Sequence, residues 1–225
     1  MRSNGFGRST LALLLGASLL WLGGCGGGLE QARLTEGDGS KASELNAPLA
    51  VGATIEPKVQ LALPGTASPR VRLVSTRPSV LGVENAEVLG RAPGVAALLI
   101  TTGGGEVLDF YHVWVEAPTR VALQLVDAEG ENLGEAREGI DLLVGEQVHL
   151  QPRSYFEAQQ LAGTLDGEWT LDSHVAEVLR QGIHQRRRLV AIAPGSARLT
   201  FTSSGVSQSL TIRVLARPHQ PGAPS

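Results

Sequence analysis

Several residue types and patterns on which common folds depend are scarce or missing in this chain. Its 225 residues include one cysteine, Cys25, and only 4% are aromatic. A single cysteine cannot form a disulfide within the chain. The apolar run Leu11 to Leu22 has 12 residues, whereas a helix that spans a bilayer needs about 20. No later stretch keeps a helical apolar period. These absences argue against a disulfide scaffold, a spanning helix and a helical domain.

The residue patterns of common enzymes are also missing. There is no Gly-x-Ser-x-Gly elbow and no Gly-x-x-x-x-Gly-Lys phosphate loop. Asp172, Ser173 and His174 are triad residue types, but neighbours on a strand point to opposite faces and cannot form a relay. The five histidines lack the spacing of a zinc site. Asp127–Asn132 resembles a calcium loop, but its glycine is in the wrong place, which favours a turn. We therefore expect no enzyme activity, no cofactor and no metal.

The residues that are present begin with an N-terminal export pattern. Arg2 and Arg8 precede the apolar run, and Leu22, Gly23 and Gly24 lead to Cys25. This segment resembles the lipobox of bacterial lipoproteins, which implies cleavage after residue 24 and a fatty-acylated Cys25. A spanning helix and an ordinary secretory signal with a free thiol are the weaker alternatives. In that family Gly26, where an aspartate favours inner-membrane retention, implies transfer to the outer membrane.

The predicted mature chain carries no global basic field. Removal of residues 1–24 takes two arginines and leaves 17 basic against 22 acidic residues, a net charge of −5. Such a chain does not favour nucleic acid as a partner. Residues 25–47 are Gly-rich and then polar, so we expect a disordered tether after the acylated cysteine. Residues 218–225, with three prolines, are expected to be a disordered tail.

The part between tether and tail repeats itself, which is the strongest fold evidence in the sequence. Leu49–Gly52 matches Leu142–Gly145, and Ala92–Leu98 matches Ala193–Leu199. Val74 aligns with Trp169 at the start of a further matching block. We align the last block by pairing Phe110, His112 and Trp114 with Leu210, Ile212 and Val214.

Within each repeat, apolar residues alternate with other residues in short stretches bounded by Gly and Pro, which is typical of half-buried strands. The repeated motifs resemble the bacterial Ig-like group 2 family (BIG2-like), whose members are β-sandwich modules of surface and periplasmic proteins. The resemblance rests on core and turn residues only. The predicted fold is therefore all-β, with two tandem Ig-like β-sandwiches over residues 48–117 and 118–217 after a lipoprotein signal peptide and a flexible tether.

One charged cluster stands out as a candidate site. The densest positive group in the sequence comprises Arg180, His184, Arg186, Arg187 and Arg188. Such a patch suits an anionic glycan, a lipid headgroup or an acidic envelope protein. The alternative is a solvated hairpin whose charges block edge-to-edge aggregation. Tyr155 and Phe156, in a segment that lengthens the second repeat, either present an apolar contact or cap one end of the sandwich.

Together these patterns predict a non-catalytic envelope lipoprotein that presents two Ig-like domains as a spacer or binding arm, anchored in the membrane through the lipid on Cys25. The alternative is a subunit of an envelope or cell-surface assembly for export, motility or adhesion, and a hydrolytic or metal-dependent enzyme is the weaker alternative. Such a subunit differs from a lone spacer by having a protein partner. The sequence leaves open the ligand, the oligomeric state, and whether the protein faces the periplasm or the cell surface.

Overall fold

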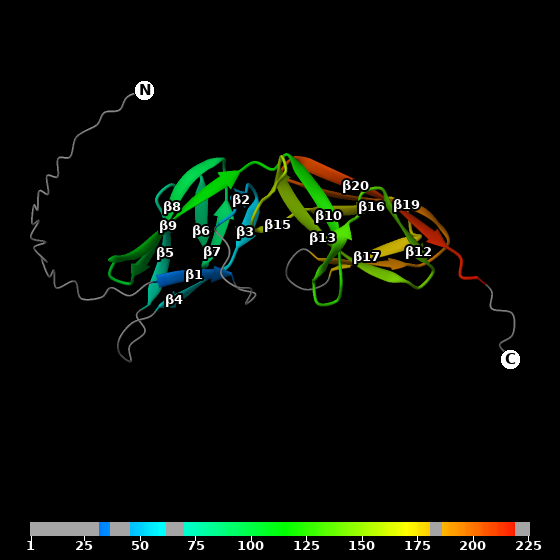
Figure 1. The fold of residues 1–225 in the computed structure, drawn as a ribbon, viewed down its shortest axis with the longest axis horizontal. Coiled ribbons are helices and arrows are strands. Elements are labelled where there is room, and N and C mark those ends of the chain that lie inside the picture. Colours follow the sequence, from blue (N-terminus) through cyan, green and yellow to red (C-terminus); the bar gives the residue numbers. More distant parts are fainter. Residues whose placement is uncertain (1–31, 37–45, 62–69, 181–185, 219–225) are drawn as a thin grey trace, which may run out of the picture.

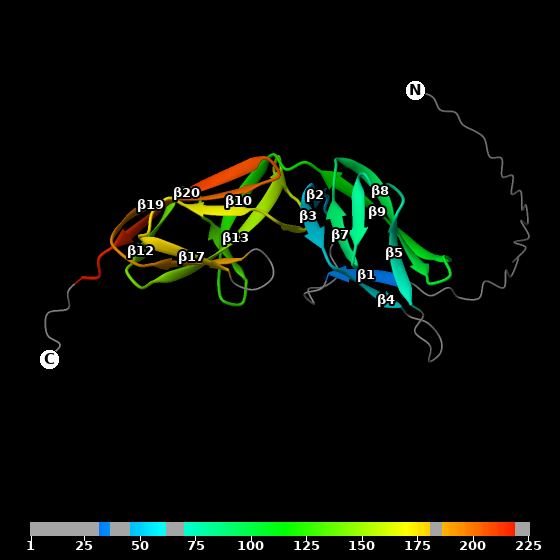
Figure 2. The same ribbon diagram turned by 180° about the vertical axis from the view of Figure 1, so that it is seen from behind.

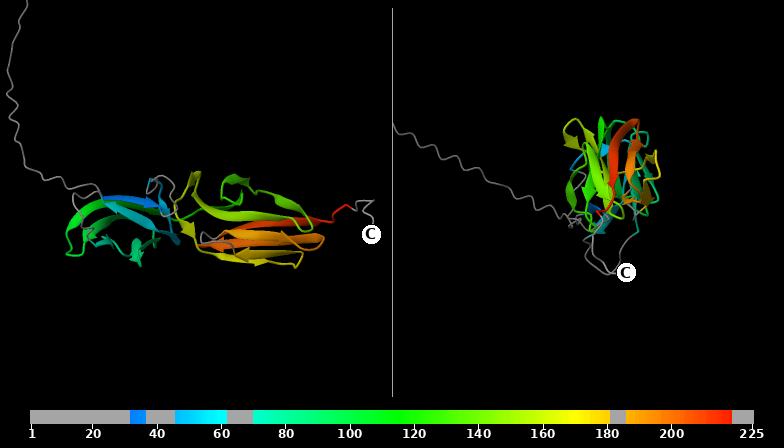
Figure 3. Two further views of the ribbon diagram at one scale, coloured as in Figure 1. Left: turned by 90° about the horizontal axis from the view of Figure 1, so that it is seen from below. Right: turned by 90° about the vertical axis from the view of Figure 1, so that its right-hand side faces the viewer.

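The computed structural model describes residues 32–36, 46–61, 70–180 and 186–218, and within them it is all-β. The strands form two sandwiches that lie end to end along the long axis (Figure 1). The view from behind in Figure 2 and the view from below in Figure 3 show the same end-to-end arrangement. The prediction of two Ig-like sandwiches, one following the other, is confirmed.

The first sandwich stacks two four-stranded sheets. Sheet I has the order β2-β9-β8-β5, made of Leu49–Ala50, Val107–Glu116, Gly94–Thr102 and Val71–Ser75. Sheet II has the order β15-β3-β7-β6, made of Thr164–Leu165, Ala53–Ile55, Glu87–Gly90 and Leu81–Glu84. β2 pairs with β9 in parallel, and the other pairs are antiparallel. Leu81, Leu98 and Val115 are buried between the two sheets.

The second sandwich repeats this plan with longer strands. Sheet III has the order β12-β20-β19-β16, made of Gly139–Leu143, Val206–Leu215, Gly195–Ser203 and Glu168–Leu171. Sheet IV has the order β11-β10-β13-β18-β17, made of Asn132–Glu135, Arg120–Val126, Gln147–Phe156, Arg187–Ala191 and Ala176–Arg180. The short strand β14, Gln159–Gln160, also pairs with β13. The core between these sheets contains Leu150, Leu189 and Phe201.

Backbone hydrogen bonds show that the internal repeat is structural. The Gly52 N–H donates to the Gly90 carbonyl at 2.8 Å, and the Gly145 N–H donates to the Ala191 carbonyl at 2.9 Å. Both donors have a left-handed backbone, with φ of 79° and 84°, which glycine adopts without a steric cost. The parallel pair β12-β20 likewise matches β2-β9.

Two blocks of the repeat are shifted by one residue from the alignment that the sequence suggested. Gly94 pairs with Val115, and Gly195 pairs with Val214, so Val115 rather than Trp114 corresponds to Val214. Phe110, His112 and Trp114 therefore correspond to Ser209, Thr211 and Arg213. By the same count Leu73, and not Val74, corresponds to Trp169, because Leu73 pairs with Ile100 and Trp169 with Phe201. A shift of one residue moves a side chain to the opposite face of its sheet.

The tether expected over residues 25–47 is wrong at one segment. Ala32–Glu36 forms strand β1, which pairs antiparallel with β4, Pro57–Leu61. β1 lies beside β4 as β10 lies beside β13 in the second sandwich. The pairing satisfies backbone groups at an edge that would otherwise be open, and this gain depends little on the side chains. The expected tail, residues 218–225, lies outside the described residues apart from Pro218.

The two sandwiches are joined at more than the linker. β9 ends at Glu116 and β10 begins at Arg120, so the chain passes almost directly from the first sandwich into the second. In addition β15, which belongs to the second half in sequence, pairs with β3 at the edge of sheet II (Figure 1). The Ala50 N–H donates to the Ala162 carbonyl, and the Ala162 N–H to the Pro48 carbonyl. The second half therefore supplies one strand of the first sandwich.

Candidate functional site

Two of the predicted site residues lie outside the described part of the chain. Cys25 precedes the first described residue, so its acylation stays a prediction. His184 falls in the undescribed residues 181–185. Among the described residues, no helix is long and apolar enough to cross a membrane.

The described arginines of the basic cluster do not share one environment. Arg187 is buried, with 6% of its surface exposed, and its guanidinium lies 5.7 Å from the centre of the Trp169 ring. Burial lowers the pKa of Arg187, and Arg180, its partner across the β17-β18 pair, lowers it further, whereas Asp166 raises it. Arg188 lies on the other face of β18, level with His149 and Leu179.

Arg186 fastens the neighbouring turn. Its Nη1 donates to the Ala128 carbonyl at 3.1 Å. The Asp127 carboxylate accepts hydrogen bonds from the backbone of Gly130 and Glu131, each at 2.7 Å, which closes the turn from inside. This carboxylate thus serves the backbone of the turn. The four described arginines therefore differ: Arg187 is buried, Arg186 holds the turn, Arg180 is exposed at the sheet edge, and Arg188 is half-buried on the opposite face from Arg187. The role of the cluster in binding stays a prediction.

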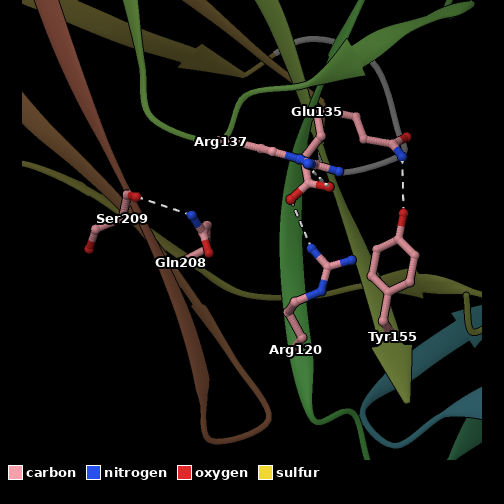
Figure 4. A network of polar contacts seen from close by, with 7 residues as sticks. Arg120, Glu135, Arg137, Tyr155, Gln208 and Ser209 are labelled. Carbon is pink, nitrogen blue, oxygen red and sulfur yellow. Dashed lines mark hydrogen bonds and ion pairs between the residues drawn. The ribbon is translucent and has the colours of Figure 1, made fainter. Parts of the chain in front are cut away.

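A second polar group holds the start of the second sandwich together (Figure 4). Arg120 Nη1 donates to the Glu135 carboxylate at 2.8 Å, and the same guanidinium lies 4.2 Å from the centre of the Tyr155 ring. The Tyr155 hydroxyl accepts from Gln124 Nε2 at 3.2 Å. Glu135 also lies 3.6 Å from Arg137. These contacts tie β10, β11 and β13 together, so Tyr155 serves the sheet rather than an outward contact.

The feature that sequence reasoning missed lies on the outer surface of sheet I. Five of the large hydrophobic side chains found exposed in the described residues lie on this one face. They are Val74, Val95, Val107, Phe110 and Trp114. Trp114 and Phe110 are 52% and 54% exposed, which is unusual for large aromatic side chains. We call this surface, together with His112, the aromatic face. Contiguous exposed apolar surfaces are typical of interaction sites in soluble proteins.

The pairing of the strands gathers these residues. Phe110, His112 and Trp114 alternate along β9, so all three point outward. The Phe110 and His112 rings meet edge to face at 5.4 Å between centroids, and His112 and Trp114 follow at 6.4 Å. Leu99 pairs with both Phe110 and Val74, and Val95 pairs with Trp114. The side chains form one continuous surface across β9, β8 and β5.

The same register positions of the second sandwich are polar. Ser209, Thr211 and Arg213 occupy the places of Phe110, His112 and Trp114. Side-chain hydrogen bonds run across that face, from Thr200 to Ser209 and from Thr202 to Ser207, each at 2.9 Å. The aromatic face is therefore a property of the first sandwich and does not follow from the shared fold. Gly94 and Gly195 begin the equivalent strands β8 and β19, and aligning the repeats on these two glycines is the sequence signal that could have revealed the aromatic face.

Comparison with known proteins gives weak likenesses. No protein-family model matches the chain, and no curated protein matches it. Domains 1–6 of the surface-layer protein SbsC are similar over 84% of this chain at 16% identity and a TM-score of 0.33, and the chain covers 28% of that structure. Yersinia pseudotuberculosis InvD is similar over 86% of this chain, which covers 60% of that structure, at 15% identity and a TM-score of 0.32. Titin domains Z1Z2 in complex with telethonin reach a TM-score of 0.25 at 16% identity, over 85% of this chain and 99% of theirs.

Proposed function

We propose that this protein is a non-catalytic lipoprotein of the cell envelope whose two Ig-like domains form one stiff arm that presents a binding surface. The observation that carries the proposal is the strand β15, because it fastens the second half to the first at a point away from the linker. Two separate connections restrict rotation between the domains far more than one short linker does.

The contacts around β15 support a fixed joint. Leu49 and Leu165 are buried, and the Ser204 hydroxyl donates to the Val51 carbonyl at 2.8 Å across the two halves. Gly163 has a φ of 92°, and a Cβ there would lie 2.7 Å from Leu49 Cδ1 and 2.9 Å from Ala53 Cβ. The turn before β15 thus packs against the first sandwich without room for a side chain.

Gly163→Ala tests the joint. We expect the added methyl group to displace β15, so that small-angle scattering of the mature chain with Cys25→Ser shows a wider range of interdomain orientations. Gly105→Ala is the matched control, because Gly105 has a φ of 89° and nothing within 4 Å of an added Cβ. Gly105→Ala therefore carries the same steric cost of a left-handed backbone but adds no contact at the joint. A compact wild-type particle, or identical scattering from both variants, would refute the stiff arm.

Cys25→Ser tests the anchor. The lipobox pattern supports acylation at this cysteine, and two or three acyl chains hold a protein firmly in a bilayer. We expect the variant to move from the membrane to the soluble fraction when envelopes are fractionated after a high-salt wash. If the variant still sediments with membranes as the wild type does, the anchor assignment is wrong.

A further inference from the structure

The segment between the proposed lipid anchor at Cys25 and the first strand is short. Six residues, 26–31, separate Cys25 from Ala32, where β1 begins. The seven steps from Cys25 to Ala32 span at most about 25 Å when fully extended. A lipid on Cys25 therefore holds the start of β1 within about 25 Å of the bilayer, so the first sandwich is the half of the chain that can reach the membrane surface.

We propose that the aromatic face of the first sandwich docks on the headgroup region of the bilayer that anchors the chain. The inference rests on the proposed function, because residues 26–31 hold the first sandwich near the bilayer only if Cys25 is acylated. It goes beyond that function by assigning a ligand, a phospholipid surface, to a named set of side chains.

The composition of the aromatic face suits a bilayer interface. Tryptophan and other aromatic rings concentrate at headgroup depth, and binding there grows with buried apolar area. Arg72 is exposed and alternates with Val74 on β5, so it points outward at the margin of the same face. Arg77 reaches the face from the next loop, where its Nη1 donates to the Val95 carbonyl at 3.0 Å. Long arginine side chains at this margin can reach lipid phosphates while their stems cover apolar surface.

The aromatic face occurs on the sandwich nearer the anchor and is missing at the equivalent positions of the other. This difference favours a bilayer as the ligand over a ligand that both sandwiches would bind. The half next to the anchor carries Phe110, His112 and Trp114, whereas the half farther from the anchor carries Ser209, Thr211 and Arg213 in the same register. An apolar surface is needed only where the membrane is within reach. Because β15 fixes the joint, docking of the first sandwich also sets the direction in which the second sandwich points.

Tryptophan fluorescence of the acylated mature chain tests the proposal. The chain after residue 24 has two tryptophans, Trp114 and Trp169, so Trp114→Phe isolates the signal of Trp169. The chain is placed on vesicles of phosphatidylethanolamine and phosphatidylglycerol, with and without brominated phospholipid. We expect bromine to quench the Trp114 signal by about twofold, since the ring lies at headgroup depth. We expect the Trp169 signal to stay unquenched.

The variant Phe110→Ser with His112→Thr keeps the probe and installs the residues that the second sandwich has at these positions. It should float with the vesicles as the wild type does but lose most of the quenching. Leu133→Ser, which changes an exposed residue of β11 instead, should leave the quenching unchanged.

Flotation and quenching separate the two proposals. A chain that floats without quenching of Trp114 overturns the docking and leaves the anchor intact. A chain that does not float refutes the anchor, and the docking is then decided on a chain held at the same position by an N-terminal histidine tag on nickel-chelating lipid. A dimer in sedimentation velocity that Phe110→Ser with His112→Thr dissolves, with Trp114 unquenched on vesicles, would assign the face to a second copy and overturn the proposal.

Discussion

The two sandwiches share a strand plan, but they place their aromatic residues on opposite sides of equivalent sheets. The first sandwich exposes Phe110 and Trp114 on the outside of sheet I and has Leu73 at the inner position. The second has Ser209 and Arg213 outside and Trp169 at that inner position, where its ring lies 4.9 Å from Phe201. The common fold therefore specifies the backbone, and each half uses its large side chains for a different purpose.

The inner position shows how the two cores differ. Trp169 packs between Phe201 and the guanidinium of Arg187, and it belongs to the cluster that fills the second sandwich. In the first sandwich the same position holds Leu73, and an open surface hollow of about 270 Å³, lined by Leu73, Val83 and the exposed Val74, lies between the edge strands β5 and β6. Leucine fills less of the sandwich than tryptophan does. We therefore expect the second core to depend more on its single large residue.

Truncation at the inner position should have the largest effect on stability. Trp169→Ala should lower the free energy of unfolding by about 3 to 5 kcal/mol, because it opens a cavity against Phe201. Leu73→Ala, at the same register in the first sandwich, should cost about 2 kcal/mol, since leucine is the smaller side chain and both residues are half-buried. Chemical denaturation followed by circular dichroism measures both values. Equal losses would contradict the difference between the cores, and no loss for Trp169→Ala would show that this ring is exposed.

Exchange of the outer residues should change stability much less. Phe110→Ser, His112→Thr and Trp114→Arg install the second sandwich's residues in the first, and Ser209→Phe, Thr211→His and Arg213→Trp do the reverse. All six side chains point outward, so we expect each triple variant to unfold within about 1 kcal/mol of the wild type. Denaturation midpoints check this expectation. A loss comparable to that of a core truncation would mean that the two halves are not in the register described above.

The sequence predicted the all-β fold and the two sandwiches, because turn residues and period-two stretches are local signals. It did not predict which face β9 buries. Residues 110–115 are apolar or aromatic almost without interruption, so alternation alone could not choose between the two faces. The pairing of Gly94 with Val115 decides which face of β9 is buried, because it places Val115 inward and Trp114 outward.

The strands β1 and β15 were not predictable for a different reason. Each is short and pairs with a partner far away in the chain, β1 with β4 and β15 with β3. Their stability comes from an open sheet edge that exists only once the first sandwich has formed. The composition of residues 25–47 correctly indicated few apolar side chains, but backbone pairing at an edge does not need them. Non-local pairing of this kind leaves no local pattern in the sequence.

Substitutions in the basic cluster of the second sandwich should have only modest effects. If this half binds an anionic glycan through charge, Arg180 and Arg188 should carry the binding, because Arg187 is buried against Trp169 and Arg186 is engaged with Ala128. We expect Arg180→Ala and Arg188→Ala each to weaken binding of the Cys25→Ser chain to a sulfated polysaccharide by about threefold, and added salt to weaken the wild type steeply. Arg72→Ala is the matched control, since it removes an exposed arginine from a strand of the first sandwich. Isothermal titration at two salt concentrations measures these differences. Two results would contradict binding through the cluster: an affinity that does not change with salt, or an equal loss of affinity in Arg72→Ala and Arg188→Ala. The cluster would then be a charged hairpin that prevents edge-to-edge aggregation, and the aromatic face would be the main difference in surface chemistry between the halves.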